Sequence, residues 1–187
     1  KERIAEYLRS GASVSPSGRY LSYFDGAELA WFVMDLSTGD VRNVSEALPH
    51  PVHNELHDSP DEPGSYGNAG WTEGDGRFLI YDRHDIWAVD PTGREAPRSI
   101  TEGVGRRDNL RFRYVDLEAG GGGGFGGFGG GGGGDDEGID PAEPMTLQAF
   151  NLWTKQEGFY RDRVQGTAEP VRLIMEDRSF GRALMQA

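Results

Sequence analysis

Two stretches of this chain follow one pattern, and this repeat limits the folds open to the chain more than any other feature. SPSGRYLSYFD (residues 15–25) and TEGDGRFLIYD (residues 72–82) both run from a turn of small residues through Gly-Arg-aromatic-Leu to a closing Asp. The segments 30–48 and 85–103 also match, because each holds an aromatic-apolar strand that ends in Asp, a Thr-Gly turn and a second short strand. Such internal similarity predicts a repeat architecture.

A third, more divergent copy follows the first two. It consists of the strand candidates MTLQAFN (145–151) and GFYRDRV (158–164), a Gln-Gly-Thr turn at 165–167, and EPVRLIMED (169–177). Aromatic and branched apolar residues fill the strand candidates, while Gly, Pro, Asp and Ser fill the turns, as short β-strands require. A unit of roughly 40 residues with three or four strands is the size of one propeller blade.

These features predict an all-β fold, a partial β-propeller of about three blades, because closed propellers typically have about 4–8. A short N-terminal helix is expected at 1–12, where Ile4 and Leu8 share one helical face. The expected organisation is a first blade at 13–48, an inserted polar loop at 49–68, a second blade at 69–103, and a third blade region at 104–187 interrupted by a disordered glycine-rich loop at 120–138. The alternative is a β-sandwich whose hairpins resemble one another by chance.

The composition supports a folded protein and limits its partners. Hydrophobic residues make up 36% of the 187 residues, enough for a packed core. The net charge of −12 argues against nucleic acid as a partner, because an acidic surface repels phosphate backbones. No apolar run approaches the roughly 20 residues of a membrane helix, and the lack of cysteine removes disulfides and thiolate sites. Because the sequence begins with Lys1 and shows no signal peptide, we expect a segment of a longer protein whose compartment is unknown.

The run GGGGGFGGFGGGGGG at 120–134 has three interpretations. A phosphate-binding loop would need a preceding strand, a following helix and usually a Lys-Ser or Lys-Thr pair, and the run is followed by neither a lysine nor a helix start. A nucleic-acid-binding Gly-Phe segment would usually carry arginine, which this run lacks. Polyglycine has maximal backbone freedom, and lengthening a loop costs little free energy. We therefore expect a spacer between strands at 111–117 and 144–150, with no function assigned to Phe125 or Phe128.

The stretch PHPVHNELHDSPDEPG at 49–64 is rich in side chains that can carry chemistry, namely His50, His53, Glu55, His57, Asp58, Asp61 and Glu62. His53 and His57 are four residues apart, a spacing that zinc ligands use on a helix. Four prolines interrupt any helix here, and Asn54 stands where the HExxH motif has glutamate. We favour a solvated acidic loop over one propeller face, and keep open a metal site and a loop that shapes the mouth of a ligand site.

No catalytic, cofactor-binding or metal-binding residue is assigned within this chain. The nucleophile-elbow motif GxSxG is absent, since GSYGNAG at 64–70 has the wrong spacing. Three of the four histidines crowd into the proline-rich loop, which argues against a complete catalytic triad. The basic stretch RRDNLRFR at 106–113 is interpreted as a solvated strand edge, with an anion site as the alternative. Core packing is expected for Trp31, Trp71, Trp87 and Trp153.

Three segments resemble one protein family. VSPSGRYLSYFDG, HDSPDEPGSYGNAGWTEGDGRFLIYDRHDIWAVDPTG and LIMEDRSFG are similar to the N-terminal β-propeller of the prolyl oligopeptidase family of serine peptidases, especially the large bacterial members similar to dipeptidyl and acylaminoacyl peptidases. The resemblance spans most of residues 13–181 apart from the glycine run, and 69–93 is its most specific part. The SPxG motif alone is weak, because TolB-type and WD-repeat propellers also carry it.

The resemblance implies a role outside catalysis for this chain. In that family a propeller covers an α/β-hydrolase domain with a Ser-His-Asp triad, and it admits peptides but not folded proteins. We therefore expect a propeller segment that gates and selects peptide substrates for its own C-terminal α/β-hydrolase domain, whose triad forms an acyl-enzyme. The glutamate pair with which dipeptidyl-type members hold a substrate amino group has no adjacent counterpart in this sequence. A bacterial member would be periplasmic or secreted.

Two other function classes stay open. A TolB-like propeller would be a protein-binding or scaffolding module without enzymatic activity, and a nucleophile elbow downstream in the reading frame would separate the peptidase from it. A free-standing metal-binding β-protein would use the loop of His53 and His57, and calorimetric titration with zinc would test that hypothesis.

Overall fold

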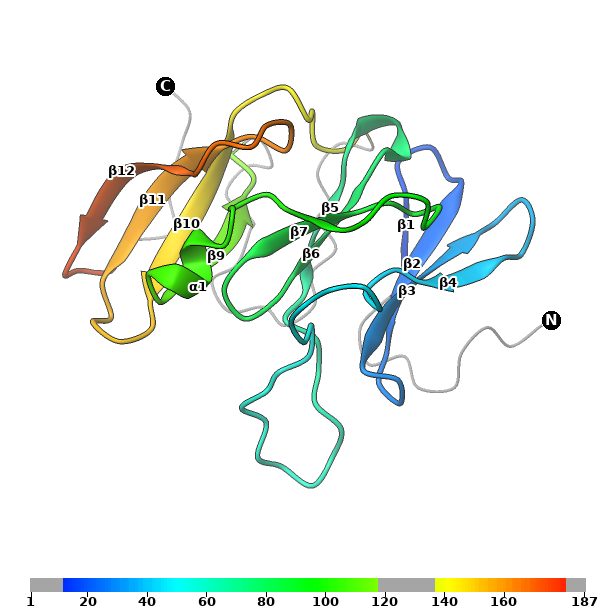
Figure 1. The fold of residues 1–187 in the computed structure, drawn as a ribbon, viewed down its shortest axis with the longest axis horizontal. Coiled ribbons are helices and arrows are strands. Elements are labelled where there is room, and N and C mark those ends of the chain that lie inside the picture. The colour runs from blue at the N-terminus through cyan, green and yellow to red at the C-terminus, as the bar shows by residue number, and fades with distance from the viewer. Residues whose placement is uncertain (1–11, 118–136, 181–187) are drawn as a thin grey trace.

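The computed structural model describes residues 12–117 and 137–180, and strands dominate them (Figure 1). The strands form three four-stranded antiparallel sheets, which we call blades 1, 2 and 3. Their strands are β1 (Ser13–Val14), β2 (Tyr20–Asp25), β3 (Ala30–Asp35) and β4 (Val41–Asn43) in blade 1, β5 (Asn68–Trp71), β6 (Phe78–Tyr81), β7 (Ile86–Val89) and β8 (Arg98–Ser99) in blade 2, and β9 (Leu110–Val115), β10 (Met145–Asn151), β11 (Glu157–Asp162) and β12 (Val171–Glu176) in blade 3. Each blade is an up-and-down meander, because its strands are neighbours in chain order.

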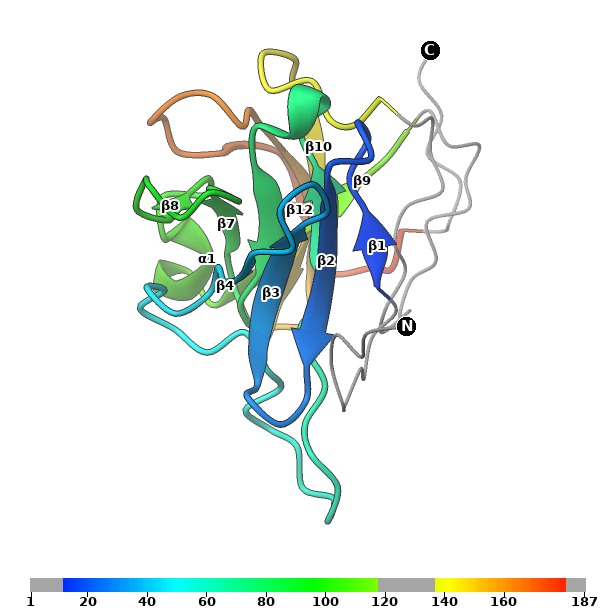
Figure 2. The same cartoon turned by 90° about the vertical axis from the view of Figure 1, so that its right-hand side faces the viewer.

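This architecture confirms the predicted all-β, partial propeller-like fold. The blades lie side by side in chain order, with blade 2 between the others (Figures 1 and 2). Helix in the described residues is limited to the 3-10 turn η1 (Glu73–Asp75) and the single turn α1 (Val104–Arg107). The helix predicted at 1–12 and nearly all of the glycine-rich loop at 120–138 lie outside the described residues.

Blade 2 is buried on both faces because its side chains alternate. Phe78 and Ile80 of β6 pack in one core cluster with blade 1, whereas Leu79 and Tyr81 pack in a second cluster with blade 3. Successive side chains of a strand point to opposite faces, so the unbroken apolar run FLIY serves both interfaces. Phe78, Leu79 and Ile80 are each no more than 1% exposed.

Aromatic rings fill the interface between blades 1 and 2. Tyr20 stacks on Trp71 with ring centroids 5.6 Å apart. Trp31 meets Phe78 edge to face, with centroids 5.4 Å apart. Pairs of this geometry contribute about 0.5–1.5 kcal/mol beyond the area they bury, so these rings fix how the two sheets pack as well as how much surface they bury.

The repeat in the sequence is reproduced in the hydrogen bonds of the turns. Asp25 and Asn151 end the second strand of blades 1 and 3, and Asp82 directly follows that of blade 2. Each accepts the backbone N–H groups two and three residues ahead. Asp35 ends the third strand of blade 1 and Asp90 directly follows that of blade 2, and each accepts the amide and hydroxyl of the residue two positions ahead. Short polar side chains close these turns by replacing backbone partners.

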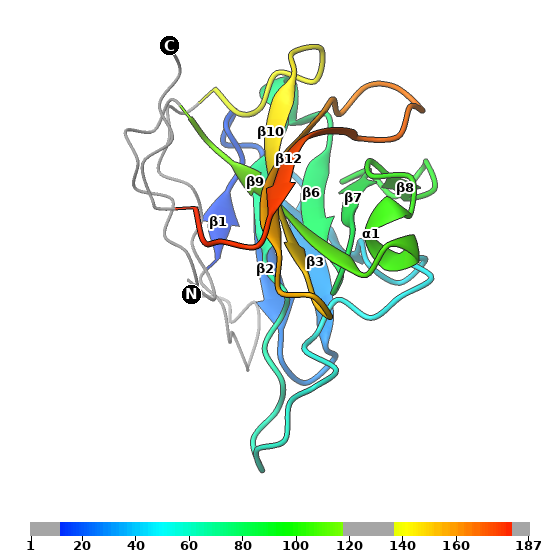
Figure 3. The same cartoon turned by 90° about the vertical axis from the view of Figure 1, so that its left-hand side faces the viewer.

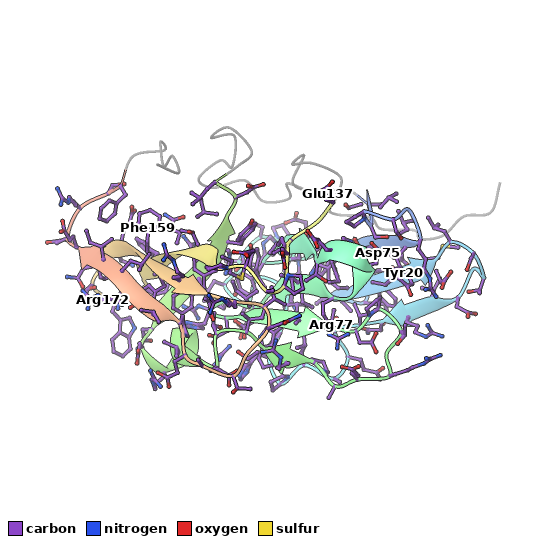
Figure 4. All side chains as sticks on the ribbon, turned by 90° about the horizontal axis from the view of Figure 1, so that it is seen from above. Tyr20, Asp75, Arg77, Glu137, Phe159 and Arg172 are labelled. Atoms are coloured by element: carbon purple, nitrogen blue, oxygen red, sulfur yellow. The ribbon has the colours of Figure 1, made fainter. Side chains whose placement is uncertain are left out.

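A buried carboxylate joins blades 1 and 2 at their upper end, where η1 lies in Figure 1. Asp75 of η1 is 5% exposed, and it accepts hydrogen bonds from Ser15 Oγ at 2.7 Å, from the Ser17 amide at 3.1 Å and from the Ser17 hydroxyl. In Figure 4, Asp75 and Tyr20 lie in the part of the molecule where these blades meet. The φ of Asp75 is 57°, a left-handed conformation that Asp and Asn tolerate better than most residues.

Blade 3 is tied to the same upper turn of blade 2 by backbone alone. The segment that leads into β10 pairs with blade 2, since the Glu73 amide donates to the Ile139 carbonyl at 2.9 Å and the Ile139 amide to the Trp71 carbonyl at 2.8 Å. Gly138 has φ of 88°, and a Cβ there would lie 3.0 Å from three backbone atoms. Each blade is thus fastened to its predecessor through the turn between its first two strands.

Asp162 ends the third strand of blade 3, as Asp35 does in blade 1, but its surroundings differ. One carboxylate oxygen accepts the Arg163 amide at 2.8 Å, while the other is buried without a hydrogen-bond partner. Burial raises the pKa of Asp162 to about 6, and the negative charge of Glu102 adds to the rise. The hydrogen bonds from Ser37 instead lower the pKa of Asp35 to about 2.

Substitutions of Asp75 should show how much its hydrogen bonds to Ser15 and Ser17 and its left-handed backbone conformation each contribute to stability. We expect Asp75→Asn to lower the free energy of unfolding by about 1 kcal/mol through weaker acceptors, and Asp75→Ala by about 2–3 kcal/mol because three donors lose their partner and φ becomes strained. Urea unfolding measures both, with exposed Asp40→Asn as the control. Equal stability of Asp75→Ala and the control would show that the hydrogen bonds of Asp75 do not hold blades 1 and 2 together.

The raised pKa of Asp162 makes stability depend on pH in a defined direction. Because its pKa is higher folded than unfolded, the stability contributed by this carboxyl is fully present below about pH 4 and is lost as the pH rises through about 6. Asp162→Asn should therefore stabilise the protein by about 1–2 kcal/mol at pH 8 and change little at pH 4. Thermal unfolding at the two pH values measures this, and equal shifts at both would contradict it.

Candidate functional site

A hairpin arm, residues 49–67, extends beyond the lower end of the blades, where the β2–β3 and β10–β11 turns also lie (Figures 1 and 3). Backbone hydrogen bonds of 2.8 Å join its two sides, from Tyr66 to Val52 and from Asn54 to Gly64. Val52 is buried in the core between blades 1 and 2. The inserted loop is therefore a projecting arm that is anchored at its base.

The histidines of the arm do not meet a third metal ligand. His57 Nε2 contacts the Asp61 carbonyl at 2.8 Å and the Asp61 carboxylate at 3.0 Å, a contact that ties the tip of the arm together. His53 forms an isolated β-bridge with Ser65. In residues 12–117 and 137–180, no group of three or more His, Cys, Asp or Glu side chains could hold a metal ion. The geometry gives the metal-site hypothesis no support.

An open cavity of about 470 Å³ lies where the arm leaves blade 1. It is bounded by the β2–β3 turn, the end of β4 and the first residues of the arm. Its lining includes two carboxylates, Glu28 and Glu46, and two imidazoles, His50 and His53. Apolar side chains, among them Leu29, Leu48 and Val52, make up the rest of the lining. The cavity places a hollow at the base of the arm, which is compatible with the interpretation of a loop beside a ligand site.

Two buried aspartates hold the β6–β7 turn of blade 2 against blade 3. Asp82 is 0% exposed, and its carboxylate accepts a hydrogen bond from the Arg106 guanidinium at 3.3 Å. Asp85 accepts the Thr101 hydroxyl at 2.7 Å and the Gly105 amide at 2.9 Å. Burial raises the pKa of Asp85, and the hydrogen bond from Thr101 opposes the rise. These hydrogen bonds hold both carboxylates in a structural role.

The same turn covers the free edge of β9. The His84 ring contacts the Leu110 carbonyl through Nδ1 at 2.9 Å, and the Phe112 amide donates to the His84 carbonyl at 2.8 Å. Only glycine fits at position 105, since a Cβ there would lie 2.6 Å from Asp85 Oδ1 and 2.7 Å from the His84 carbonyl oxygen. An edge strand that would otherwise offer unpaired amides is closed in this way.

A cluster of arginine and tyrosine side chains lies where the arm, blade 2 and blade 3 meet. Arg113 of β9 folds over Tyr81, with Cζ 4.4 Å from the ring centroid, and donates to the Asp82 carbonyl at 3.3 Å. Burial lowers the pKa of Arg113 to about 10. Burial also raises the pKa of Tyr66 at the base of the arm, and the positive charges of Arg83 and Arg113 oppose that rise. Both guanidinium groups therefore act on one phenol.

The basic stretch at 106–113 does not form one surface. Arg106 and Arg113 turn toward blade 2, whereas Arg107 and Arg111 are exposed. The interpretation as a solvated strand edge thus describes Arg107 and Arg111 and is wrong for Arg106 and Arg113. Strand alternation puts Arg111 and Arg113 on the same face of β9, so no local pattern distinguishes them. Arg113 differs because Tyr81 and the Asp82 carbonyl of blade 2 lie within its reach.

The tryptophans do not share one role. Trp31 and Trp71 are buried in the core between blades 1 and 2, and Trp87 is partly buried against it. The prediction of core packing is wrong for Trp153, which is 77% exposed. Its amide is bound by the Asn151 side chain, so that the chain leaves the strand and turns just before the indole.

Comparison with models of protein families finds no match to this chain, and searches of curated proteins and of solved structures find none either. The likeness to prolyl oligopeptidase propellers therefore stays a prediction from the motifs. None of the helices described by the structure is long and apolar enough to span a membrane.

Two neighbouring arginines offer a matched test of the blade 2–blade 3 junction. Arg106→Gln should lower the free energy of unfolding by about 2–3 kcal/mol, because it leaves the fully buried Asp82 without its charged partner. Arg107→Gln removes only exposed ion pairs with Asp108 and Glu169 and should leave the unfolding midpoint almost unchanged. Chemical denaturation compares the two variants. Similar losses for both would show that the buried pair does not hold the junction.

Proposed function

We propose that this chain is a non-catalytic propeller segment of a serine peptidase of the prolyl oligopeptidase type, which gates and selects peptide substrates for an α/β-hydrolase domain elsewhere in the polypeptide. The observation that carries the proposal is the succession of three four-stranded meanders packed face to face, with an arm at one end. Consecutive blades of a propeller have this arrangement. The motifs at 13–25 and 69–93 supply the link to the peptidase family.

Gating by size requires blades that keep their positions, and the ties between blades meet this requirement. Asp75 fastens the upper end of blades 1 and 2, while Asp82 and Asp85 fasten the lower end of blades 2 and 3. The arm is rooted in the core through Val52, and Leu56 near its tip is 66% exposed. Blades held in fixed positions, with an arm projecting from them, would obstruct the entry of a folded protein more than the entry of an extended peptide.

The chemistry of peptide-bond cleavage belongs, in this proposal, to the hydrolase domain. There a serine hydroxyl attacks the scissile carbonyl, a histidine takes its proton, and an aspartate holds the imidazole in the required orientation. The residues described here contribute access and positioning. Such a division places selection by size and by end group on the propeller and turnover on the triad.

A TolB-like protein-binding module is the second candidate function. The exposed Trp153 favours it, because this side chain lies on a turn at the same end of the blades as the arm. Large aromatic side chains are enriched at protein interfaces. In this candidate, the lower end would dock a partner protein and the polypeptide would have no hydrolytic activity.

The reading frame beyond Ala187 separates the two candidates. The peptidase proposal expects a GxSxG elbow followed by Asp and then His, and it expects the polypeptide that contains them to hydrolyse peptides while residues 1–187 alone do not. A frame that ends after further blades, without an elbow, would overturn the proposal and favour the binding module.

The arm should control substrate size in the complete peptidase. Replacing residues 55–62 by a short Gly-Ser linker is expected to raise kcat/KM for long polypeptides several-fold and to leave a dipeptide substrate unaffected, because only large substrates meet the arm. Peptidase assays on both substrates measure this. Shortening the β11–β12 turn at the upper end provides the control, and an equal effect of the two changes would argue against gating by the arm.

A further inference from the structure

A second cavity, of about 190 Å³, lies between blades 1 and 2 at their upper end, opposite the arm. Strands β3 and β7 both run toward this end, and the turns that follow them form two of the cavity walls. Because a molecule of liquid water takes about 30 Å³, the cavity has room for about six waters. It is therefore large enough to hold one small polar group.

Three arginines from three different elements line this cavity. Arg19 directly precedes β2, Arg42 lies in β4, and Arg94 lies in the turn between β7 and β8. The last two come together across the blades, since a Cβ built on Gly93 would lie 3.7 Å from Arg42 Cδ. All three arginines are exposed to solvent, so a ligand can reach them.

Two carboxylates also line the cavity, and they do not neutralise it. Asp35 is 7% exposed, and it is occupied by the Ser37 amide and hydroxyl and by Arg19 at 3.2 Å. Asp40 stands 3.8 Å from Arg42, beyond hydrogen-bond distance, and its side chain is 63% exposed, so that water weakens this pair. Three guanidinium groups and two carboxylates leave the lining with one net positive charge, in a chain whose net charge is −12.

Most of the guanidinium donors at the cavity have no acceptor. Arg19 donates to Asp35 through Nε and Nη2, which leaves Nη1 free. The Arg94 side chain forms no hydrogen bond or ion pair with any residue that the structure describes. Thr38 adds a hydroxyl whose oxygen accepts the Asp40 amide at 3.2 Å, while its hydrogen has no acceptor among the described residues. Because guanidinium groups only donate, either water or an anion must satisfy them.

We propose that this cavity binds a phosphate group, either as free inorganic phosphate or on a phosphorylated peptide. Guanidinium groups form strong, charge-assisted hydrogen bonds with phosphate. A tetrahedral phosphate presents oxygens in several directions, which suits arginines that come from three elements, whereas a carboxylate presents two oxygens in one plane. A cation would meet three guanidinium groups that offer it no acceptor. The site rests on the cavity and its arginines, independently of the proposed peptidase function.

Calorimetric titration of residues 1–187 at low ionic strength tests the site. The probes are inorganic phosphate, acetate, acetyl-Ala-phosphoserine-Ala amide and acetyl-Ala-Asp-Ala amide. We expect saturable binding of phosphate that is at least about tenfold tighter than that of acetate, because phosphate engages more of the guanidinium donors. Binding of the phosphoserine peptide as tightly as phosphate would identify a phosphorylated peptide as the ligand, and its exclusion would identify free phosphate.

Variants connect phosphate binding to the arginines. Arg94→Gln should weaken it about tenfold and leave circular dichroism unchanged, because this side chain makes no contact that the fold needs. Arg161→Gln is the matched control, since it removes an exposed arginine of β11 that also has no ion pair, and it should leave the affinity unchanged. Asp40→Asn should tighten binding several-fold, because it removes the carboxylate that pairs with Arg42.

Three results would overturn the proposal. They are the lack of saturable binding of both phosphate and the phosphoserine peptide, equal affinity for the phosphate and carboxylate probes, and an affinity for phosphate that Arg94→Gln and Arg161→Gln change alike. The last result would show that phosphate responds only to the overall charge of the chain. A reading frame without a nucleophile elbow would refute the peptidase and leave the measured phosphate binding standing, so the two failures are distinguishable.

Discussion

Burial of both faces of blade 2 is the constraint on which the rest of the structure depends. Phe78 and Ile80 are buried against blade 1, and Leu79 and Tyr81 are buried against blade 3. Neither pair would be shielded from water without the neighbouring blade. Full burial of such a side chain contributes about 1.5–3 kcal/mol. The hydrogen bonds of Asp75 at the upper end contribute less, and they fix the alignment of sheets that apolar burial brings together.

One repeated turn has acquired different roles in different blades. The turn after the second strand is closed by Asp25 in blade 1, Asp82 in blade 2 and Asn151 in blade 3. In blade 2 the carboxylate also binds Arg106 from the following α1 segment, which ties the turn to blade 3. Because the Asp82 carboxylate is occupied in this way, Arg113 binds the backbone carbonyl of Asp82 instead.

The sequence predicts the local structure well and the contacts between blades poorly. The Gly-Arg-aromatic-Leu repeat identifies β2 and β6, and MTLQAFN coincides with β10, because strand periodicity and turn residues are local properties. The bond from Ser15 to Asp75 spans 60 residues and depends on how two sheets pack, which no local pattern encodes. Trp153 is exposed although its large apolar side chain suggested core packing. The strand ends at Asn151, before Trp153 is reached, because the Asn151 side chain closes a turn there.

Amide hydrogen exchange followed by mass spectrometry tests the central claim most directly, because it reports the stability of each strand separately. If blade 2 is held by cover on both faces, the amides of β6 and β7 should exchange most slowly in the chain, and those of β1, β4 and β12 should exchange much faster. Exchange of β6 and β7 at the rate of these outer strands would mean that the three sheets do not protect one another, and would contradict the account.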